Sequence, residues 1–360
     1  MKTEIAVMTE EEPDLEAINK AGEIIRNGGL VAFPTETVYG LGGDAKNAGS
    51  SRKIYAAKGR PSDNPLIVHI ARMEDLYSIV SEVPEMAERL AEELWPGPLT
   101  MIFKKNDAIP EETTGGLDTV AVRFPSGRIA RELIKASGGY IAAPSANLSG
   151  RPSTTKATHV ITDMDGRIDM IIDGGDCRIG LESTIVDVTG DVPVILRPGF
   201  YSGSCLEKIV GNYSVDPAVK GEKTDGPPKA PGMKYRHYAP KAELILVEGP
   251  PEAVVLKISE LLSKSAAEGV KAAVICSEET KDMYKSGLVY ALGSRNSEEE
   301  IAHSLFDVLR QTDDAGAEII YSETFDTPLL GKAIMNRLFK AAGFNIIRLQ
   351  EERSNDSTRV

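Results

Sequence analysis

Apolar side chains recur along the chain at two spacings, one typical of helices and one typical of strands. Residues 13–27 carry theirs at helical spacing, at Leu15, Ile18, Ile24 and Ile25. The pair Gly28-Gly29 ends this helix, because glycine readily stops a helix at its carboxyl end. The apolar run at 30–33 follows and predicts a strand, so the chain opens with a helix and then a strand.

The following segments continue with short elements of both kinds. Helical patterns lie at 51–57 and at 73–94, where Pro84 interrupts the second. Apolar runs of strand length lie at 66–70, 99–103, 119–124, 140–143, 170–172, 184–188 and 194–196. This mixture predicts an α/β domain with a mixed sheet, because it holds more strands than a doubly wound fold usually carries.

Glycine, proline and charged residues replace the apolar pattern from 202 to 240, which we interpret as a linker. After it, strand patterns at 244–247, 272–276, 289–292 and 319–321 alternate with helical patterns, one of which has Ser297 as a candidate cap. Regular alternation predicts a smaller, Rossmann-like domain with a parallel sheet. The expected organisation is a first domain at 1–201, a linker at 202–240 and a second domain at 241–360.

Composition and charge narrow the class of protein. The chain has 360 residues, of which 41% are hydrophobic and 26% are charged, which is enough for two soluble domains. The net charge of -13 disfavours strong direct binding to nucleic acid. No apolar run reaches the roughly 18 residues of a membrane helix, so we expect a cytoplasmic protein with no membrane partner. Neither the three cysteines nor the four histidines are spaced for a zinc site, and no metal ligands are expected.

The stretch GLGGDA at 40–45 has the spelling of a dinucleotide-binding loop, G-x-G-x-x-A. Its context does not fit, because the residues PTETVY at 34–39 separate the glycines from the strand, and Arg60 stands where an acidic ribose partner is expected. The phosphate-binding sequence G-x-x-x-x-G-K-[ST] does not occur either. A nucleotide would therefore have to be held by side chains and irregular backbone.

Two segments offer such side chains. The first, 52–65, carries four basic residues against one acidic residue, and its KGRP sequence places Lys58 and Arg60 around a glycine beside a proline. That arrangement suits oxygen anions, although a solvated helix end would carry the same residues. The second, 142–155, follows a strand and is rich in Ser, Thr and Asn, as are many ligand-binding loops and many ordinary turns.

Taken together, these segments resemble the YrdC-like threonylcarbamoyl-AMP synthases, in the longer form that has a second, carboxyl-terminal domain. The resemblance rests on eight ordered motifs: FPTETVYGLG (33–42), KGRP (58–61), PLIVH (65–69), WPGPLT (95–100), VRFP (122–125), APSANLSG (143–150), ESTIVD (182–187) and LRPG (196–199). The linker sequence PGMKYRHYAP at 231–240 is also similar to that of the two-domain form. The resemblance covers essentially the whole chain and implies a YrdC-like domain with a twisted mixed sheet and a concave basic pocket.

The resemblance implies synthesis of L-threonylcarbamoyladenylate from L-threonine, bicarbonate or CO2 and ATP, with release of pyrophosphate. The product would pass to a tRNA threonylcarbamoyl transferase complex, for threonylcarbamoyl-adenosine modification of tRNA. Mg²⁺ would enter with ATP to offset the pyrophosphate charge. Lys58 and Arg60 would be the catalytic phosphate clamps.

The resemblance also assigns binding residues. L-Threonine would be held by Thr35, His69, Arg123 and Ser183, with a bidentate pair between Arg123 and the carboxylate. The nucleotide would be held by Lys58, Arg60, Asn64, Thr119, Ser145, Asn147, Ser153, Arg197 and Tyr235. Tyr235 and, beside it, Arg236 would make the linker a lid that excludes water from the mixed anhydride. Gly40, Gly42 and Gly43 would let the backbone pass close to the threonine side of the pocket.

Two other functions fit parts of the sequence. An RNA-binding module would use the basic surface at 53–60, but the net charge of -13 counts against it. A related domain occurs in hydrogenase-maturation carbamoyltransferases, but those carry zinc-finger segments, and this sequence contains no C-x-x-C.

Overall fold

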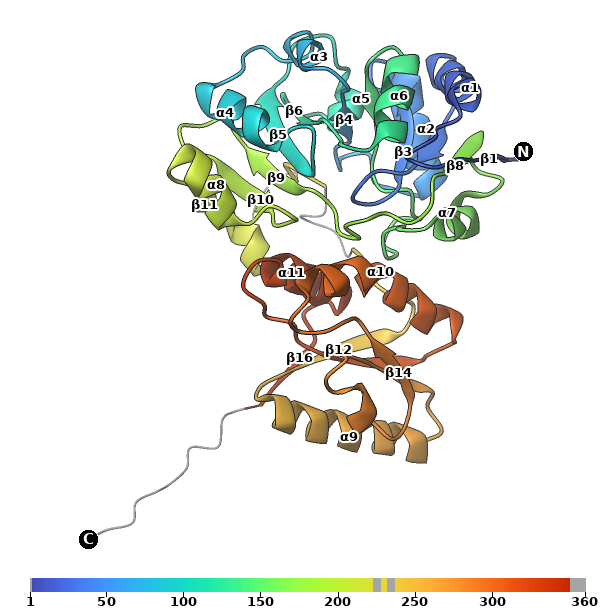
Figure 1. The fold of residues 1–360 in the computed structure, drawn as a ribbon, viewed down its shortest axis with the longest axis vertical. Helices are drawn as coiled ribbons and strands as arrows, with labels where there is room; N and C mark the ends of the chain where they lie inside the picture. The colour runs from blue at the N-terminus through green and yellow to red at the C-terminus, as the bar shows by residue number, and fades with distance from the viewer. Residues whose placement is uncertain (1, 223–227, 232–236, 350–360) are drawn as a thin grey trace.

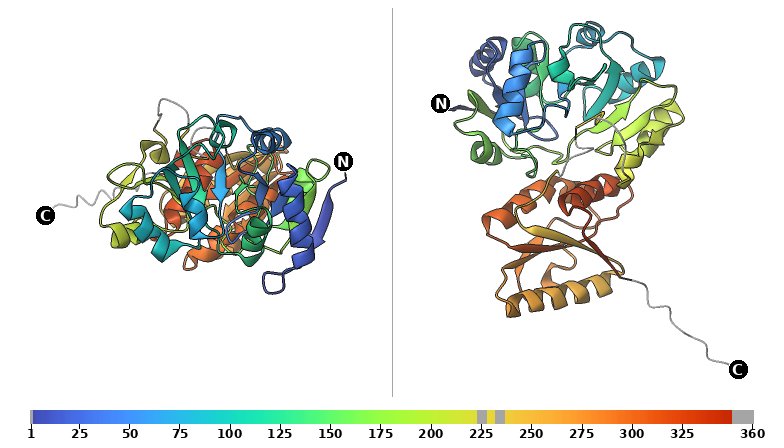
Figure 2. Two further views of the ribbon diagram at one scale, coloured as in Figure 1. Left: turned by 90° about the horizontal axis from the view of Figure 1, so that it is seen from above. Right: turned by 180° about the vertical axis from the view of Figure 1, so that it is seen from behind.

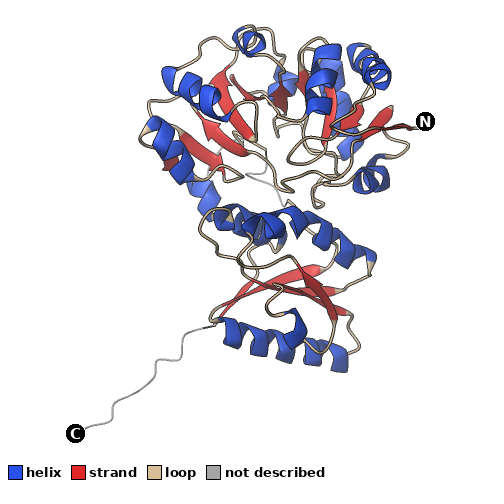
Figure 3. Cartoon of the chain, in the orientation of Figure 1, coloured by secondary structure: helices blue, strands red, loops and turns tan. Residues whose placement is uncertain are grey.

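The computed structural model describes residues 2–222, 228–231 and 237–349, and Figure 1 shows two domains. A large mixed sheet forms the amino-terminal domain, and a smaller parallel sheet forms the carboxyl-terminal domain. Helices flank both sheets (Figure 3), which confirms the predicted α/β class. In the described residues, no helix has the length and apolar character needed to cross a membrane.

The described residues of the amino-terminal sheet form an 11-stranded layer. Its strands are β1 (Glu4–Val7), β2 (Val31–Phe33), β3 (Gly40–Asp44), β4 (Ile67–His69), β5 (Leu99–Lys104), β6 (Thr119–Arg123), β7 (Ile141–Ala142), β8 (Met170–Asp173), β9 (Thr184–Asp187), β10 (Val194–Arg197) and β11 (Ser214–Val215). Its helices are α1 (Leu15–Arg26), α2 (Ala48–Lys58), α3 (Met73–Tyr77), α4 (Glu85–Leu94), α5 (Glu111–Thr114), α6 (Arg128–Ala136) and α7 (Ala157–Met164). The strand order is β1-β8-β2-β3-β7-β4-β6-β5-β9-β10-β11. The sheet is mixed, because β4 runs parallel to β6 and antiparallel to β7.

Local sequence signals explain where the first helices begin and end. The carboxylate of Asp14 accepts hydrogen bonds from the backbone N–H groups of Glu16 and Ala17, each at 3.0 Å, and so caps α1. Gly59 ends α2 in the left-handed conformation, with φ of 62°, which glycine adopts at little cost. The chain then turns sharply, so that Lys58 and Arg60 stand on either side of this glycine.

The glycine stretch at 40–44, which has the spelling of a dinucleotide-binding loop, forms strand β3. It pairs antiparallel with β2 in the middle of the sheet. A Cβ atom on Gly42 would lie 2.8 Å from Ile141 and 2.9 Å from Phe33, so core side chains already fill that space. Gly43 is likewise surrounded by core side chains. The expectation that all three glycines bring backbone to the pocket is therefore wrong for Gly42 and Gly43, and only Gly40 of the three lines the cavity described below.

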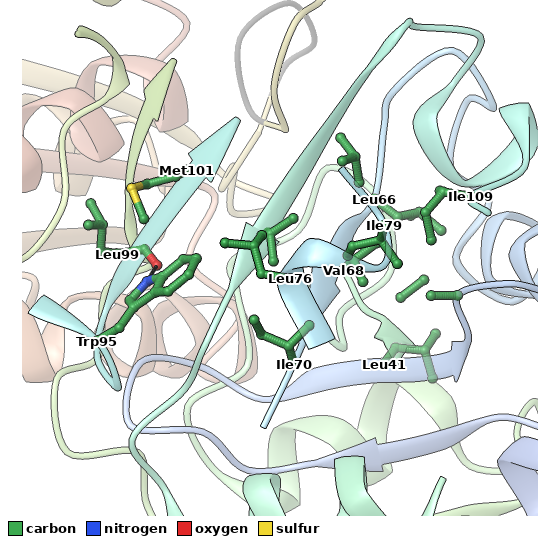
Figure 4. Packing of buried hydrophobic residues seen from close by; sticks show 14 of the residues in the cluster. Leu41, Leu66, Val68, Ile70, Leu76, Ile79, Trp95, Leu99, Met101 and Ile109 are labelled. Carbon is green, nitrogen blue, oxygen red and sulfur yellow. Dashed lines mark hydrogen bonds between the residues drawn. The ribbon is translucent and has the colours of Figure 1, made fainter. Parts of the chain in front are cut away.

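The largest apolar core packs against β3, β4 and β5 (Figure 4). The buried side chains labelled there are Leu41, Leu66, Val68, Ile70, Leu76, Ile79, Trp95, Leu99, Met101 and Ile109. The indole N–H of Trp95 donates to the carbonyl oxygen of Leu99 at 2.8 Å, so its only polar atom is satisfied within the core. Because each fully buried leucine or isoleucine contributes roughly 1.5–3 kcal/mol, this core fixes strands whose ends carry candidate site residues.

The range 202–240 contains more regular structure than its composition predicts. Helix α8 (Gly203–Val210) begins at Ser202, whose hydroxyl accepts from the backbone N–H of Cys205 at 3.4 Å. Strand β11 then pairs parallel with β10, and the 3-10 helix η1 (Pro217–Lys220) follows. The first half of the predicted linker therefore extends the amino-terminal sheet, which sequence patterning missed because these elements are very short.

The carboxyl-terminal domain confirms the predicted parallel sheet. Its strands are β12 (Glu243–Glu248), β13 (Ala272–Cys276), β14 (Leu288–Ala291), β15 (Ile319–Glu323) and β16 (Ile346–Arg348), and its helices are α9 (Pro251–Ala267), η2 (Lys281–Met283), α10 (Glu298–Asp314) and α11 (Gly331–Ala341). The order is β14-β13-β15-β12-β16, with every pair parallel. The edge strand β16 was not predicted. Ser297 does precede α10, but its side chain forms no capping hydrogen bond.

Helices α10 and α11 cover the face of this sheet that meets the amino-terminal domain, whereas α9 covers the outer face (Figures 1 and 2). Polar contacts cross between the domains: Arg310 forms an ion pair with Asp163 at 2.8 Å, and His159 Nε2 lies 3.1 Å from the Asp307 carboxylate. The two domains are therefore joined by polar contacts from α10 as well as by the connecting chain.

Candidate active site

One cavity gathers seven separate segments of the amino-terminal domain. Its lining comes from the segment after β2, the end of α2, strands β4 and β6, the loop after β7, the segment before β9, and the end of β10. The predicted site residues in the lining are Thr35, Lys58, Arg60, His69, Arg123, Ser145, Asn147, Ser153, Ser183 and Arg197. The space left between the side chains is about 60 Å³, roughly the share of two water molecules in the liquid.

Thr35 and His69, both predicted to hold threonine, are buried and already hydrogen-bonded. The hydroxyl of Thr35 donates to the carbonyl oxygen of Val38 at 2.6 Å, which closes the turn after β2. His69 Nδ1 lies 3.1 Å from the carbonyl oxygen of Ile67. Burial, and next the charge of Arg123, lower the pKa of His69 to about 3. The imidazole is therefore neutral at physiological pH, and it can offer hydrogen bonds but no charge to a substrate.

Arg123 is held by two residues of the segment after β2. Its Nη1 donates to the hydroxyl of Thr37 at 2.9 Å, and its Nη2 lies 2.7 Å from the Glu36 carboxylate. The Arg123 and Glu36 side chains are each only 5% exposed. Since Arg123 ends β6, strand pairing with β4 and β5 also fixes its backbone. The predicted carboxylate partner of threonine is thus pre-oriented, and Glu36 is a contact that the sequence analysis did not assign.

Lys58 is the last residue of α2, and it is 2% exposed. Its ammonium group donates to the backbone carbonyls of Ser145 and Asn147. Burial, and next the repulsion of Arg60, lower the pKa of Lys58 well below its usual value. Two of the three N–H donors hold the loop after β7, so Lys58 has a structural role besides the predicted phosphate contact.

Arg60 is also buried and anchored to backbone. Its Nε donates to the carbonyl oxygen of Asn64 at 3.2 Å, and its Nη2 to that of Pro65 at 3.0 Å. Burial lowers the pKa of Arg60 to about 10, so the guanidinium stays charged at neutral pH. Asn64 itself does not line the cavity, and its nucleotide contact stays a prediction. It acts on the site through the carbonyl that orients Arg60.

The hydroxyl-rich loop after β7 is held by its own side chains. Ser145 Oγ donates to Asn147 Oδ1 at 2.5 Å, and the Asn147 amide donates to the carbonyl oxygens of Leu148 and Arg151 at 2.8 and 3.0 Å. These are bonds of an ordinary turn, yet Ser145 and Asn147 also line the cavity. The turn interpretation of this loop is therefore confirmed, whereas the ligand-binding interpretation stays a prediction for residues that line the cavity.

The residues predicted for threonine and those predicted for the nucleotide meet at Ser183. Arg197 Nη2 donates to the Ser183 hydroxyl at 3.1 Å and to its carbonyl oxygen at 3.0 Å. The antiparallel pairing of β9 and β10 brings these residues together. The two predicted sets thus belong to one cavity, as a direct reaction between two ligands requires.

Besides Asn64, two predicted nucleotide residues are not part of the described lining. Thr119 begins β6 and pairs with Lys104, whereas the opposite end of the strand, Arg123, reaches the cavity. A strand rises about 3.3 Å per residue, so the two ends are roughly 13 Å apart, and the nucleotide contact of Thr119 stays a prediction. Tyr235, like Arg236, lies outside the described residues.

Several lining residues were not assigned from the sequence, among them Glu182, His237 and Tyr238. Glu182 is buried, with one carboxylate oxygen 2.5 Å from the Ser153 hydroxyl and the other 3.0 Å from Nε of Arg337. Tyr238 is buried in the left-handed conformation, with φ of 64°, which is uncommon for tyrosine and typical of functional segments. Motif ESTIVD contains Glu182, but nothing in the spacing indicates a partner 155 residues later.

No group of three or more His, Cys, Asp or Glu side chains in the described part of the chain is arranged to hold a metal ion. Glu182 is the one carboxylate among the described lining residues, and Ser153 and Arg337 engage both its oxygens. The lining therefore offers a metal ion no unengaged carboxylate.

Two family models match the chain. The Sua5/YciO/YrdC model, described as telomere recombination, matches residues 23–199, and a model described as the threonylcarbamoyl-AMP synthase C-terminal domain matches residues 203–343. A curated protein of Pyrococcus abyssi, named threonylcarbamoyl-AMP synthase, is 51% identical and covers 92% of this chain and 96% of its own length. The protein of that name from Bacillus subtilis is 46% identical, with 92% and 94% covered. The crystal structure of P. abyssi Sua5 complexed with L-threonine matches with a TM-score of 0.92 at 50% identity, over 97% of this chain and 100% of that one.

Proposed function

The chain belongs to the Sua5/YrdC family and is an enzyme of the threonylcarbamoyl-AMP synthase kind, and from this premise we propose that it makes L-threonylcarbamoyladenylate from L-threonine, bicarbonate or CO2, and ATP. Pyrophosphate is the second product. The P. abyssi relative was crystallised with L-threonine, which supports threonine as a substrate here.

One observation carries the proposal: a cavity rich in cations in a protein of net charge -13. Its described lining holds five basic residues, Lys58, Arg60, Arg123, Arg151 and Arg197, against the single acid Glu182. Two anionic reactants repel each other in water, and fixed cations in a water-poor cavity offset that repulsion. Threonine carbamate and ATP are such a pair.

The reaction needs positioning more than a covalent intermediate. The threonine amine adds to CO2 and loses a proton, which gives a carbamate. A carbamate oxygen then attacks the α-phosphorus, and the bond from the α-phosphorus to the oxygen that bridges it to the β-phosphorus breaks, so that pyrophosphate leaves with the bonding electrons. We assign binding of the threonine carboxylate to Arg123. The backbone of Arg123 is fixed, because this residue ends strand β6, which pairs with β5. Lys58 and Arg60 face the phosphates, where negative charge accumulates.

Mg²⁺ would be held by the triphosphate itself, because the described lining offers no unengaged carboxylate. When bound, the ion offsets charge on the leaving pyrophosphate. Lys58 and Arg60 would act on the remaining phosphate oxygens.

The product is a mixed anhydride, which water hydrolyses, so a second enzyme has to accept the threonylcarbamoyl group soon after it forms. We propose that the acceptor pathway is tRNA modification by a separate transferase complex in the cytoplasm. Direct tRNA binding by this chain is not required for that transfer.

The test is pyrophosphate release from ATP by the purified chain. Release should require both L-threonine and bicarbonate, and mass spectrometry should find the threonylcarbamoyl adenylate. Release that is independent of threonine, or no release by a folded protein that binds ATP, would refute the proposed reaction.

A further inference from the structure

One side chain of the carboxyl-terminal domain reaches the wall of the candidate active site. Arg337 on α11 is completely buried, and its Nε lies 3.0 Å from the carboxylate of Glu182. Glu182 lines the cavity and is itself 5% exposed. A fully buried ion pair between two domains therefore ends directly at the cavity wall.

Arg337 also contacts two other parts of that wall. Its Nη1 donates to the carbonyl oxygen of Pro198, next to Arg197. Its guanidinium carbon lies 5.8 Å from the ring centroid of Tyr238, on the segment that joins the domains. The single side chain thus ties together the segments before β9, after β10 and before β12.

The ion pair also sets the orientation of a predicted nucleotide residue. The second oxygen of Glu182 accepts from the Ser153 hydroxyl at 2.5 Å. Because Arg337 fixes one carboxylate oxygen, the other has a defined place, and the Ser153 hydroxyl follows it. Arg337 therefore acts on Ser153 through one intervening carboxylate.

The contact between Arg337 and Glu182 matters for an anionic ligand because Glu182 is negatively charged. Burial raises the pKa of Glu182, but attraction by Arg337 and then by Arg197 outweighs burial and keeps the pKa below its usual value. Glu182 is therefore an anion in a cavity whose other described charged lining residues are basic. Without Arg337, that carboxylate would be less compensated and would repel the phosphates.

We propose that Arg337 is a positioning residue for ATP, so that the carboxyl-terminal domain completes the nucleotide half of the active site. The proposal rests on the proposed function, because it takes ATP as the ligand of the Lys58 and Arg60 side of the cavity. Threonine is expected to be little affected, since Arg123 is held by Thr37 and Glu36 and not by Arg337.

Other contacts between the domains lie away from the cavity, so holding the domains together does not by itself require an ion pair at the cavity wall. The pair between His159 and Asp307 also joins the two domains, at 3.1 Å, and Lys156 pairs with the same aspartate at 2.9 Å. None of these three residues lines the cavity. Asp307→Asn is therefore a matched control that weakens the domain contact without changing the described cavity wall.

The experiment compares R337M, R337K and D307N in the full chain. Calorimetry measures the Kd of a non-hydrolysable ATP analogue and, separately, the Kd of L-threonine, while thermal unfolding measures the fold. R337M should weaken ATP-analogue binding at least about tenfold, which corresponds to about 1.4 kcal/mol, and should leave threonine binding within about twofold. R337K should recover part of the affinity, because it keeps the charge but loses the bond to Pro198. D307N should lower the unfolding temperature without changing ATP affinity.

A double variant separates charge from packing. In R337M/E182Q the repelling carboxylate is gone, so ATP affinity should recover relative to R337M. If R337M does not fold, R337K and the double variant give the same comparison against the wild-type chain.

Equal ATP affinities in R337M, D307N and the wild-type chain would overturn the proposal, as would an equal loss of threonine and ATP affinity in R337M. Failure of the proposed function is a different result: a wild-type chain that binds the ATP analogue but releases no pyrophosphate with threonine and bicarbonate.

Discussion

Replacing Lys58 with methionine should destabilise the protein and stop turnover, because this lysine both holds a loop and faces the cavity. Methionine is nearly as long but has no N–H donor. The change removes two charge-assisted bonds to the carbonyls of Ser145 and Asn147, each worth roughly 1.5–3 kcal/mol. Part of that loss is offset, because the folded protein no longer buries an ammonium group. We expect the free energy of unfolding to fall by about 2–4 kcal/mol, a large share of the 5–15 kcal/mol typical of a domain.

Urea unfolding followed by circular dichroism measures the stability, and pyrophosphate release measures turnover. Loss of one preorganised donor to a developing charge typically costs about 10²–10³ in kcat, and we expect that range for K58M. Lys53→Met is the matched control, since Lys53 lies on the same helix, donates to the carbonyl oxygen of Gly28 at 2.6 Å, and does not line the cavity.

K53M should lose some stability and keep its turnover. A contrary result would be a K58M chain that loses stability but keeps its turnover within about threefold of the wild-type chain, which is well short of the effect of a lost oxyanion donor. In that case Lys58 only anchors the loop, and the phosphate-clamp assignment is wrong. Lost turnover at unchanged stability would instead refute the loop-holding role.

Three further predictions follow from the site. Arg123→Lys cannot keep both the contact with Thr37 and that with Glu36, so the KM for threonine should rise about tenfold or more while the Kd for ATP stays nearly constant; an unchanged KM would remove Arg123 from threonine binding. The pKa of His69 is lowered to about 3, so its contribution to stability is present above the unfolded pKa of about 6.5 and is lost as pH falls toward 3. Urea unfolding should show about 2 kcal/mol of loss from this group between pH 7.5 and pH 5, and a His69→Gln variant that keeps the same slope would contradict it. Thr119 begins β6 at the end opposite Arg123, so Thr119→Ala should leave the KM for ATP unchanged; a raised KM would instead support the nucleotide contact that the resemblance implies.

Strands with a continuous apolar run were predictable from the sequence, and β4, β5 and β9 lie within one or two residues of their expected positions. Strand β3 was missed because its sequence, GLGGD, carries no apolar periodicity. It is a strand because neighbouring strands pair with it on both sides and because only glycine leaves room for the core side chains there. Tertiary packing therefore overrode local propensity at this position.

The candidate site was likewise only partly predictable from the sequence. Motif resemblance found most of the lining, since motifs record which residue types a pocket uses. It missed Glu36 as the partner of Arg123, because a motif does not say which side chains meet across strands.

The sequence by itself determined the two-domain α/β organisation, the positions along the chain of the strands with continuous apolar runs and the basic residue types of the cavity, because apolar periodicity and motif chemistry are local properties of the chain. Only the tertiary structure decided that Lys58 also holds the loop after β7 and that Arg337 of the second domain meets Glu182 of the first. These contacts join residues from 87 to 155 positions apart. They exist because burial forces each cation to find an oxygen partner, wherever along the chain that partner lies.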